Sequence, residues 1–254
     1  MIRPYILAET NWKQVKDTKY DLAILPWGAT KAHNYHLPYA TDNIEGTAIA
    51  ATSAKIAWEK GAKVIVLPNM PYGVNTGQSD IYLDMNLNPS TQFAILKDLL
   101  QVLDTQGIHK FMILNSHGGN NWKPILRELG LLYPNMFLCF TFWPSSLDRK
   151  QYFDTPGDHA DEMETSLLLH LAPQLVLPKK DWGSGNAKKS TIQAFNEGWA
   201  WTERPWSVIS EDTGVGNPKA STKEKGEVFF NALCEKMGQL FHDIATTDVD
   251  KLYQ

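Results

Sequence analysis

The chain has 254 residues, of which 43% are hydrophobic and 20% charged, and a formal net charge of −4. This composition is ordinary for a globular protein with a substantial core. No run of Lys and Arg is present, which argues against nucleic acid and anionic membrane surfaces as partners. No apolar segment approaches the roughly 20 residues that a bilayer requires, and the first residues do not resemble a secretory signal. We therefore expect a cytoplasmic protein in which Cys139 and Cys234 are buried thiols. The sequence alone does not exclude a disulfide between them.

Strand and helix patterns alternate along the chain. Four short apolar runs predict strands that are buried on both faces, namely Leu22–Leu25, Val64–Leu67, Phe111–Leu114 and Met136–Phe142. The helices that we predict are Asn43–Lys60 with Thr41 and Asp42 as caps, one from Ser90 to Gly107, one from near Pro124, and one from a capping box at Ser221 and Glu224. This alternation predicts an α/β fold with a mainly parallel sheet and helices on both faces.

Residues 179–217 differ from the rest because they are rich in Gly, Trp, Ser and Asn and show no clear periodicity. A structureless segment of this length inside a compact domain is usually functional. We interpret it as an insertion or lid, the alternative being a mobile surface excursion. Neither an internal repeat nor a linker between two cores is evident. The prediction is a single domain over residues 1–254.

Polar side chains follow the predicted strands at their carboxyl ends, where the loops of a parallel sheet converge and ligands bind. The first strand leads into PWGATKAHNYHLPYATD and the third into NSHGGNN, and DHADEMETS follows later. Imidazole and carboxylate groups together favour zinc, manganese or iron, and such sites without cysteine are more often catalytic than structural. The candidate side chains in these segments are Lys31, His33, His36, Asp42, His117, His159 and Glu162.

Local spacing adds to the metal hypothesis. His33 and Asp42 lie nine residues apart across one loop, and Gly118 and Gly119 allow the backbone to approach a metal or substrate closely. Glu162, three residues after a histidine, would be an inward carboxylate that is costly to bury without a cation. Each signal also has an ordinary explanation, such as a surface histidine pair or a glutamate that stabilises a helix dipole.

Four segments resemble motifs of the creatininase (creatinine amidohydrolase) family, in the family's order and over residues 20–230. They are LPWGATKAHNYHLPYATD, NSHGGNN, DHADEMETS and GVGNPKASTKEKGE. The resemblance implies a three-layer α/β/α domain, commonly a hexamer, that hydrolyses small and often cyclic amides. It also implies two divalent metals bridged by Asp42, one of them held by His117 and the other by His33 and Glu162.

The same resemblance assigns roles around the substrate. It puts His159 where protons move at the scissile amide, and Trp143 where an aromatic residue covers the substrate. Tyr35 replaces a small residue of the family motif, and we expect it to shape the substrate pocket together with His36 and the two glycines after His117.

Lys31 is the departure that matters most, because the family has a glutamate ligand at its position and an ammonium repels a metal ion. The favoured interpretation is that Lys31 pairs with Asp42 beside a vacant position, and that one ion remains on His33, Asp42 and Glu162, with His117 as a further ligand or neighbour. In the alternatives, Lys31 turns to solvent and both metals bind, or the site holds no metal.

The working hypothesis is hydrolysis of a C–N amide bond by metal-activated water, with zinc favoured over manganese or iron and one ion over two. His159 moves protons, and Lys31 either stabilises the oxyanion or serves as an ion-pair partner of Asp42. A homo-oligomer is expected. The competing hypotheses are a small-molecule-binding protein that has lost catalysis, and a metal-dependent hydrolase of another bond, such as a deformylase.

Overall fold

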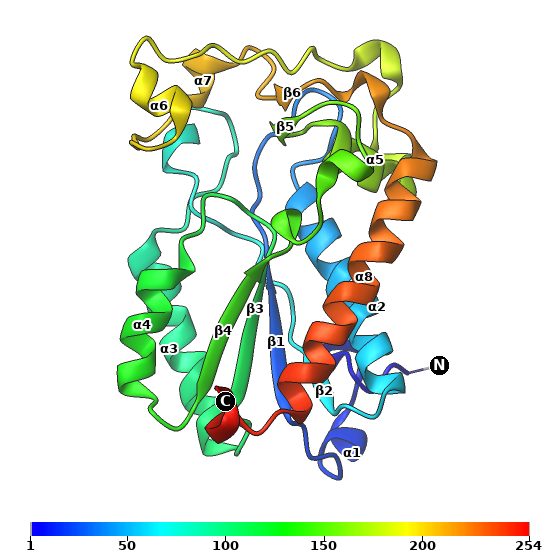
Figure 1. The fold of residues 1–254 in the computed structure, drawn as a ribbon, viewed down its shortest axis with the longest axis vertical. Coiled ribbons are helices and arrows are strands. Elements are labelled where there is room, and N and C mark those ends of the chain that lie inside the picture. The colour runs from blue at the N-terminus through cyan, green and yellow to red at the C-terminus, as the bar shows by residue number, and fades with distance from the viewer. Residues whose placement is uncertain (1, 254) are drawn as a thin grey trace.

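The computed structural model describes residues 2–253, and its centre is a four-stranded sheet in which every neighbouring pair is parallel (Figure 1). The predicted apolar runs coincide with the four strands to within two residues at either end. In spatial order the strands are β2 (Val64–Val66), β1 (Leu22–Trp27), β3 (Lys110–Asn115) and β4 (Phe137–Phe142).

Helices cover both faces of this sheet, which confirms the predicted three-layer α/β/α fold (Figure 1). One face carries α2 (Thr41–Glu59), α5 (Glu162–Leu171) and α8 (Lys223–Thr246), and the other carries α3 (Pro89–Thr105) and α4 (Trp122–Leu132). A short α1 (Trp12–Val15) precedes the sheet. Within residues 2–253, no helix is both long and apolar enough to cross a membrane.

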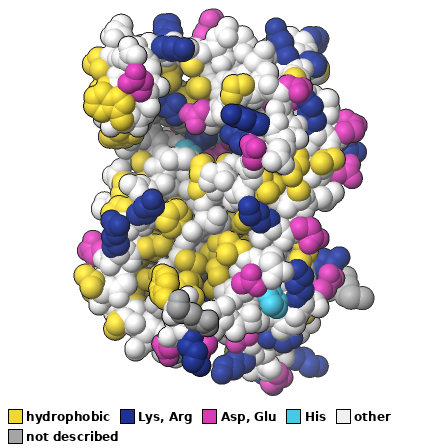
Figure 2. All heavy atoms as spheres, in the orientation of Figure 1, with side chains coloured by type: hydrophobic (Ala, Val, Ile, Leu, Met, Phe, Trp, Pro, Cys, Tyr) yellow, Lys and Arg dark blue, Asp and Glu magenta, His cyan; other side chains and the backbone are white. Residues whose placement is uncertain are grey.

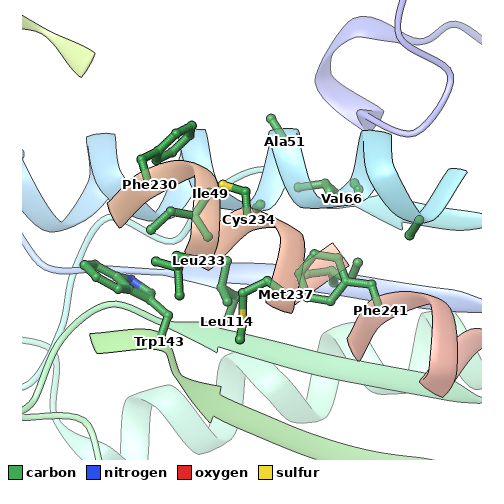
Figure 3. Close-up of a cluster of buried hydrophobic side chains, with 14 of the residues drawn as sticks. Ile49, Ala51, Val66, Leu114, Trp143, Phe230, Leu233, Cys234, Met237 and Phe241 are labelled. Carbon is green, nitrogen blue, oxygen red and sulfur yellow. The ribbon is translucent and has the colours of Figure 1, made fainter. Parts of the chain in front are cut away.

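A hydrophobic cluster between the sheet, α2 and α8 fixes the helices against the strands (Figure 3). Leu233 and Met237 of α8 point toward the sheet, where Leu114 meets them. Cys234 belongs to this cluster, and neither it nor the half-buried Cys139 forms a disulfide with another described residue. Burial raises the pKa of both thiols to about 12, so they are inert side chains of the core.

The start of α2 differs from the prediction. Thr41 and Asp42 are not caps but lie in the first turn, after Ala40, whose side chain makes no capping bond. The carboxylate of Asp42 is therefore available at the carboxyl end of the sheet, close to the positive end of the helix dipole.

The 179–217 segment crosses the molecule beyond the carboxyl ends of the strands (Figure 1). It contains α6 (Gln193–Glu197) and α7 (Trp206–Ile209) and ends with β6 (Val215–Gly216), which pairs antiparallel with β5 (Gly157–His159). A long-range hydrogen bond anchors the segment beside this pair. The Asn34 side chain accepts it from the backbone N–H of Gly183 at 2.9 Å. The segment is thus fastened to the loop that carries His33.

Candidate active site

A cavity of about 820 Å³ opens at the carboxyl end of the sheet, beneath the 179–217 segment. Figure 2 shows it as a hollow below the part of the molecule that carries α6 and α7, with a histidine visible inside. Loops after β1 and β3, the start of α2 and the β5–α5 connection all contribute to its lining. The polar groups that they supply include Lys31, Asp42, His117, His159 and Glu164.

Asp42 lies at the centre of this group and is only 1% exposed. Its Oδ1 is 2.8 Å from His33 Nε2, and its Oδ2 is 3.2 Å from His117 Nδ1 and 3.6 Å from the ammonium of Lys31. Burial alone would raise the pKa of Asp42, but the ammonium of Lys31 holds it well below its ordinary value. Asp42 is therefore a buried carboxylate anion.

Three histidines surround Asp42 in a fixed orientation. In each ring the outer nitrogen faces a backbone carbonyl oxygen, which can only accept, so that nitrogen must carry the hydrogen. The inner nitrogen of each ring then faces Asp42 or Lys31. The outer contacts are His33 Nδ1 to Lys31 O at 2.9 Å, His117 Nε2 to Val74 O at 2.8 Å, and His159 Nε2 to Ala32 O at 2.9 Å.

The charge state of two of these rings follows from their surroundings. Burial, followed by the ammonium of Lys31, lowers the pKa of His33 and holds that of His159 well below its ordinary value. Both rings are thus neutral near pH 7. An imidazole that donates its outer N–H to a carbonyl and aims a lone pair inward has the orientation found in metal-ligating histidines.

Lys31 points into the protein and is 3% exposed. Its Nζ lies 2.9 Å from His33 Nε2 and 3.0 Å from His159 Nδ1, so the ammonium donates to both lone pairs. The expected pairing with Asp42 is present, but it is the longer contact. The ammonium therefore lies mainly between two imidazoles and not on the side of His117.

Two further carboxylates complete the group, and the sequence analysis did not place either of them there. Glu45 and Glu164 are buried, and one oxygen of each lies within 4.8 Å of an oxygen of Asp42. Burial raises the pKa of Glu164 to about 8 and that of Glu45 well above its ordinary value. In the sequence, the position of Glu45 one helical turn after Asp42 indicates that the two side chains share a helix face.

The structure corrects the assignment of Glu162 as a metal ligand. Its side chain leaves the cluster and forms an ion pair with Lys225 of α8. It also accepts hydrogen bonds from the backbone N–H groups of Asp154 at 3.0 Å and Thr155 at 2.8 Å. Glu162 is thus satisfied by protein groups, and Glu164, two residues later, points to the histidines instead.

A family model described as creatinine amidohydrolase matches residues 8–241. The chain belongs to the creatininase family. The crystal structure of a putative creatinine amidohydrolase from Bacteroides fragilis NCTC 9343 is 39% identical, covers 100% of both chains and superposes with a TM-score of 0.93.

More distant relatives differ in name. The mycofactocin precursor peptide peptidase of Mycobacterium tuberculosis is 25% identical over 223 residues, which cover 84% of this chain and 81% of that protein. A manganese form of creatininase shares the fold with a TM-score of 0.76 and 19% identity, over 96% of this chain and 99% of the other. This chain is thus similar to proteins named for peptide and for creatinine chemistry.

The residues expected to contact substrate divide into two groups. Gly118 and Gly119 line the cavity, and a side chain at Gly119 would collide with the carbonyl oxygen of Val74. Trp143 does not line it, which corrects its expected place over the substrate. Its ring is fully buried in the hydrophobic cluster (Figure 3), and its Nε1 donates to Ser116 Oγ at 2.9 Å.

Tyr35 and His36 also lie outside the cavity lining. Tyr35 is 56% exposed, whereas His36 is buried, stacks on Trp182 at 4.8 Å and contacts Thr165 Oγ1 at 2.9 Å. Burial lowers the pKa of His36 to about 4, so it is a neutral packing residue. These two expectations are corrected as well, since both residues hold the loop and the 179–217 segment and do not reach the cavity.

One tryptophan of the 179–217 segment does reach the site. The ring of Trp206 meets His159 edge-on at 4.9 Å, and the guanidinium of Arg204 lies 4.7 Å from the same ring. Both residues line the cavity. Trp199 and Trp201, by contrast, are exposed. The segment therefore covers the site through Arg204 and Trp206.

Proposed function

We propose that this protein hydrolyses a C–N amide bond of a small, often cyclic, substrate, using one divalent cation on Asp42 and His117 together with the ammonium of Lys31. The observation that carries the proposal is the convergence of three imidazoles and buried carboxylates on Asp42, with the ammonium of Lys31 between two of the imidazoles. A neutral or hydrophobic ligand would gain little from so many acceptors, whereas a cation and a developing oxyanion require such charges.

The side of Asp42 that faces His117 fits a cation. Asp42 Oδ2 and His117 Nδ1 are 3.2 Å apart, and Nε2 of the same ring is directed at Val74 O. Asp42 Oδ2 has no hydrogen-bond partner among residues 2–253. A cation near both atoms would use this oxygen and this nitrogen together as ligands. One imidazole and one carboxylate favour zinc, with manganese or iron as alternatives.

The other side of Asp42 already has its positive charge. The ammonium of Lys31 donates to His33 and His159, which removes the lone pair that His33 would offer to a second metal. This supports one ion and not two. It also changes the expected division of ligands, because the cation is proposed on the His117 side and Lys31 on the His33 side.

Residues of the chain have distinct tasks in the proposed reaction. When bound, the divalent cation would lower the pKa of a water molecule toward about 7 and polarise the substrate carbonyl. Lys31 would stabilise negative charge that develops on the substrate oxygen. His159, neutral and hydrogen-bonded to that ammonium, would take the proton that the attacking water releases and pass it to the leaving nitrogen, while Lys31 stays charged.

A peptide bond is the second candidate target. The cavity of about 820 Å³ is near the upper end of the roughly 300–1,000 Å³ of small-molecule sites, and would hold more than a single small ring. The similarity to the mycofactocin precursor peptide peptidase supports the same candidate. A peptide would enter with one end, since the cavity closes toward Asp42.

We also expect a homo-oligomer in the cytoplasm. The exposed side chains of Trp199 and Trp201, at 75% and 81% of their area, support a subunit contact, because such large apolar groups are uncommon on a free surface. Size-exclusion chromatography with light scattering is the direct measurement.

Elemental analysis joined to a screen of lactams, formamides and short peptides tests the proposed function. We expect about one equivalent of metal per chain, turnover of at least one amide class, and loss of turnover after chelation. A protein that carries no metal, acquires none from zinc or manganese salts, and cleaves no amide would contradict the proposal and favour a binding protein without catalysis.

A further inference from the structure

Glu45 is the buried charged side chain that the proposed function leaves unexplained. It is 0% exposed, and neither of its carboxylate oxygens has a hydrogen-bond partner within the described part of the chain. An unpartnered ionised group in the interior costs several kcal/mol unless a cation or proton balances it. The chain therefore contains a buried carboxyl group that needs a proton or a cation from solution as its counterpart.

We propose that Glu45 is a direct ligand of a divalent cation beside Asp42, so that Asp42, Glu45 and Glu164 together form a carboxylate-rich site at the start of α2. This inference rests on the proposed function only for the presence of a cation beside Asp42. One oxygen from each of the three residues lies within 4.8 Å of the others. Metal–oxygen bonds of about 2.0–2.6 Å allow a single ion to bridge such a span.

Helix geometry brings the three carboxylates together. Asp42 and Glu45 lie three residues apart on α2 and share one face, while Glu164 approaches from the first turn of α5. Asp42 and Glu164 line the cavity, which gives an ion from solution access to the group. Glu45 does not line the cavity and is fully buried beside them.

Lys31 does not replace this ion. Its ammonium makes its two short contacts with imidazole nitrogens and reaches Asp42 only at 3.6 Å. One ammonium also opposes three carboxylates, which leaves the group two charges short of neutrality when all three are ionised. A divalent cation supplies that charge.

The ligand chemistry points to the kind of ion. Three carboxylates make a harder, more oxygen-rich set than one carboxylate with one imidazole, and such sets suit manganese and magnesium better than zinc. Glu45 therefore moves the expected preference from zinc toward manganese.

The experiment compares Mn²⁺ binding to the metal-stripped wild-type chain and to Glu45→Gln by isothermal titration calorimetry. Loss of a group behind a metal ligand typically costs 10–100-fold in affinity, so loss of a direct ligand should weaken Mn²⁺ binding by at least about 100-fold. The rise in Tm that Mn²⁺ produces should disappear with it. Glu59→Gln is the matched control, since it makes the same change at a 64%-exposed side chain of the same helix.

If Glu45→Gln binds Mn²⁺ with the affinity of the wild type, the inference is overturned. Glu45 is then a protonated acid that shares a proton with Glu164. If Glu45→Gln does not fold, infrared spectroscopy of the wild type decides: the carbonyl band of protonated carboxyl groups must weaken when Mn²⁺ binds, and an unchanged band overturns the inference. A wild-type chain that binds no Mn²⁺ overturns it too. A chain that binds Mn²⁺ through Glu45 yet cleaves no amide contradicts only the proposed function.

Discussion

The two sides of Asp42 differ in the source of their positive charge. On the side of His33 and His159, the protein supplies a cation of its own, and the ammonium of Lys31 satisfies both imidazole lone pairs. On the side of His117, Nδ1 of that ring lies 3.2 Å from Asp42 Oδ2, which has no hydrogen-bond partner among residues 2–253. One half of the site is thus preorganised by the chain, and the other half depends on an ion from solution.

Asp42→Asn should have the largest effect, because this side chain belongs to both halves. We expect metal content to fall to near zero and kcat/KM to fall by at least about a thousandfold, the range for removal of a central catalytic group. Elemental analysis and steady-state kinetics measure the two effects. Glu162→Gln is the control, since it also removes a buried carboxylate but one that Lys225 and backbone N–H groups already satisfy; if it lost the metal as well, the two-sided account would fail.

Substitutions of Lys31 test the two sides of the site separately. Lys31→Met should lower kcat by about 10²–10³-fold, as loss of an oxyanion donor does, and leave the single metal equivalent in place. Lys31→Glu removes the built-in cation and adds a ligand, so the metal content should rise from about one toward two. Lys55→Met, on an exposed face of α2, controls for loss of a lysine. Unchanged turnover in Lys31→Met would show that the ammonium is only an ion-pair partner.

Stability should depend on pH in a way that reveals the unsatisfied half. The folded pKa of Glu164, about 8, lies above its ordinary 4.5, so the folded metal-free protein binds a proton that the unfolded chain has released. That stabilisation is complete below about 4.5 and is lost as pH rises through about 8. His33 and His159 have lowered pKa values and act with the opposite sign, but only below about 7.

From pH 7 to 9 the carboxylates therefore dominate, and the Tm of the metal-free protein should fall as pH rises. Glu45, whose pKa is also raised, adds to the fall. Bound Mn²⁺ should reverse the trend, because the cation replaces the proton. A metal-free Tm that is flat over this range, measured by scanning calorimetry, would show that these carboxylates are not paired with protons in the folded state.

The sequence predicted the sheet and half of this site, for physical reasons that differ. Strands buried on both faces are continuous apolar runs, and the carboxyl ends of parallel strands must meet, which placed His33, Asp42 and His117 in advance. His159 was placed there by the family resemblance. Glu45 could not be found in the same way, because a glutamate in a helix most often faces solvent.

Glu162 and Glu164 illustrate the limit more sharply. Both lie in the first turn of α5, and periodicity alone does not decide which one faces the histidines. The choice depends on Lys225, which lies 63 residues after Glu162 and draws its carboxylate toward α8. The prediction that Trp143 covers the substrate failed for a similar reason. The direction of its side chain is set by a hydrogen bond to Ser116 and by the packing of α8.

The smallest expected effect concerns the 179–217 segment, which lies over the side of the site that contains Lys31. Trp206 contacts His159 edge-on and lines the cavity, so Trp206→Leu should weaken substrate binding without changing the metal content. Aromatic contacts contribute about 0.5–1.5 kcal/mol beyond buried area, which corresponds to a rise in KM of roughly two- to tenfold with kcat nearly unchanged. Trp12→Leu is the matched control, because that ring in α1 is exposed and away from the cavity. If Trp206→Leu lowered kcat and left KM unchanged, the ring would act by holding His159 in place beside Lys31. That result would contradict a role of the 179–217 segment in covering the substrate.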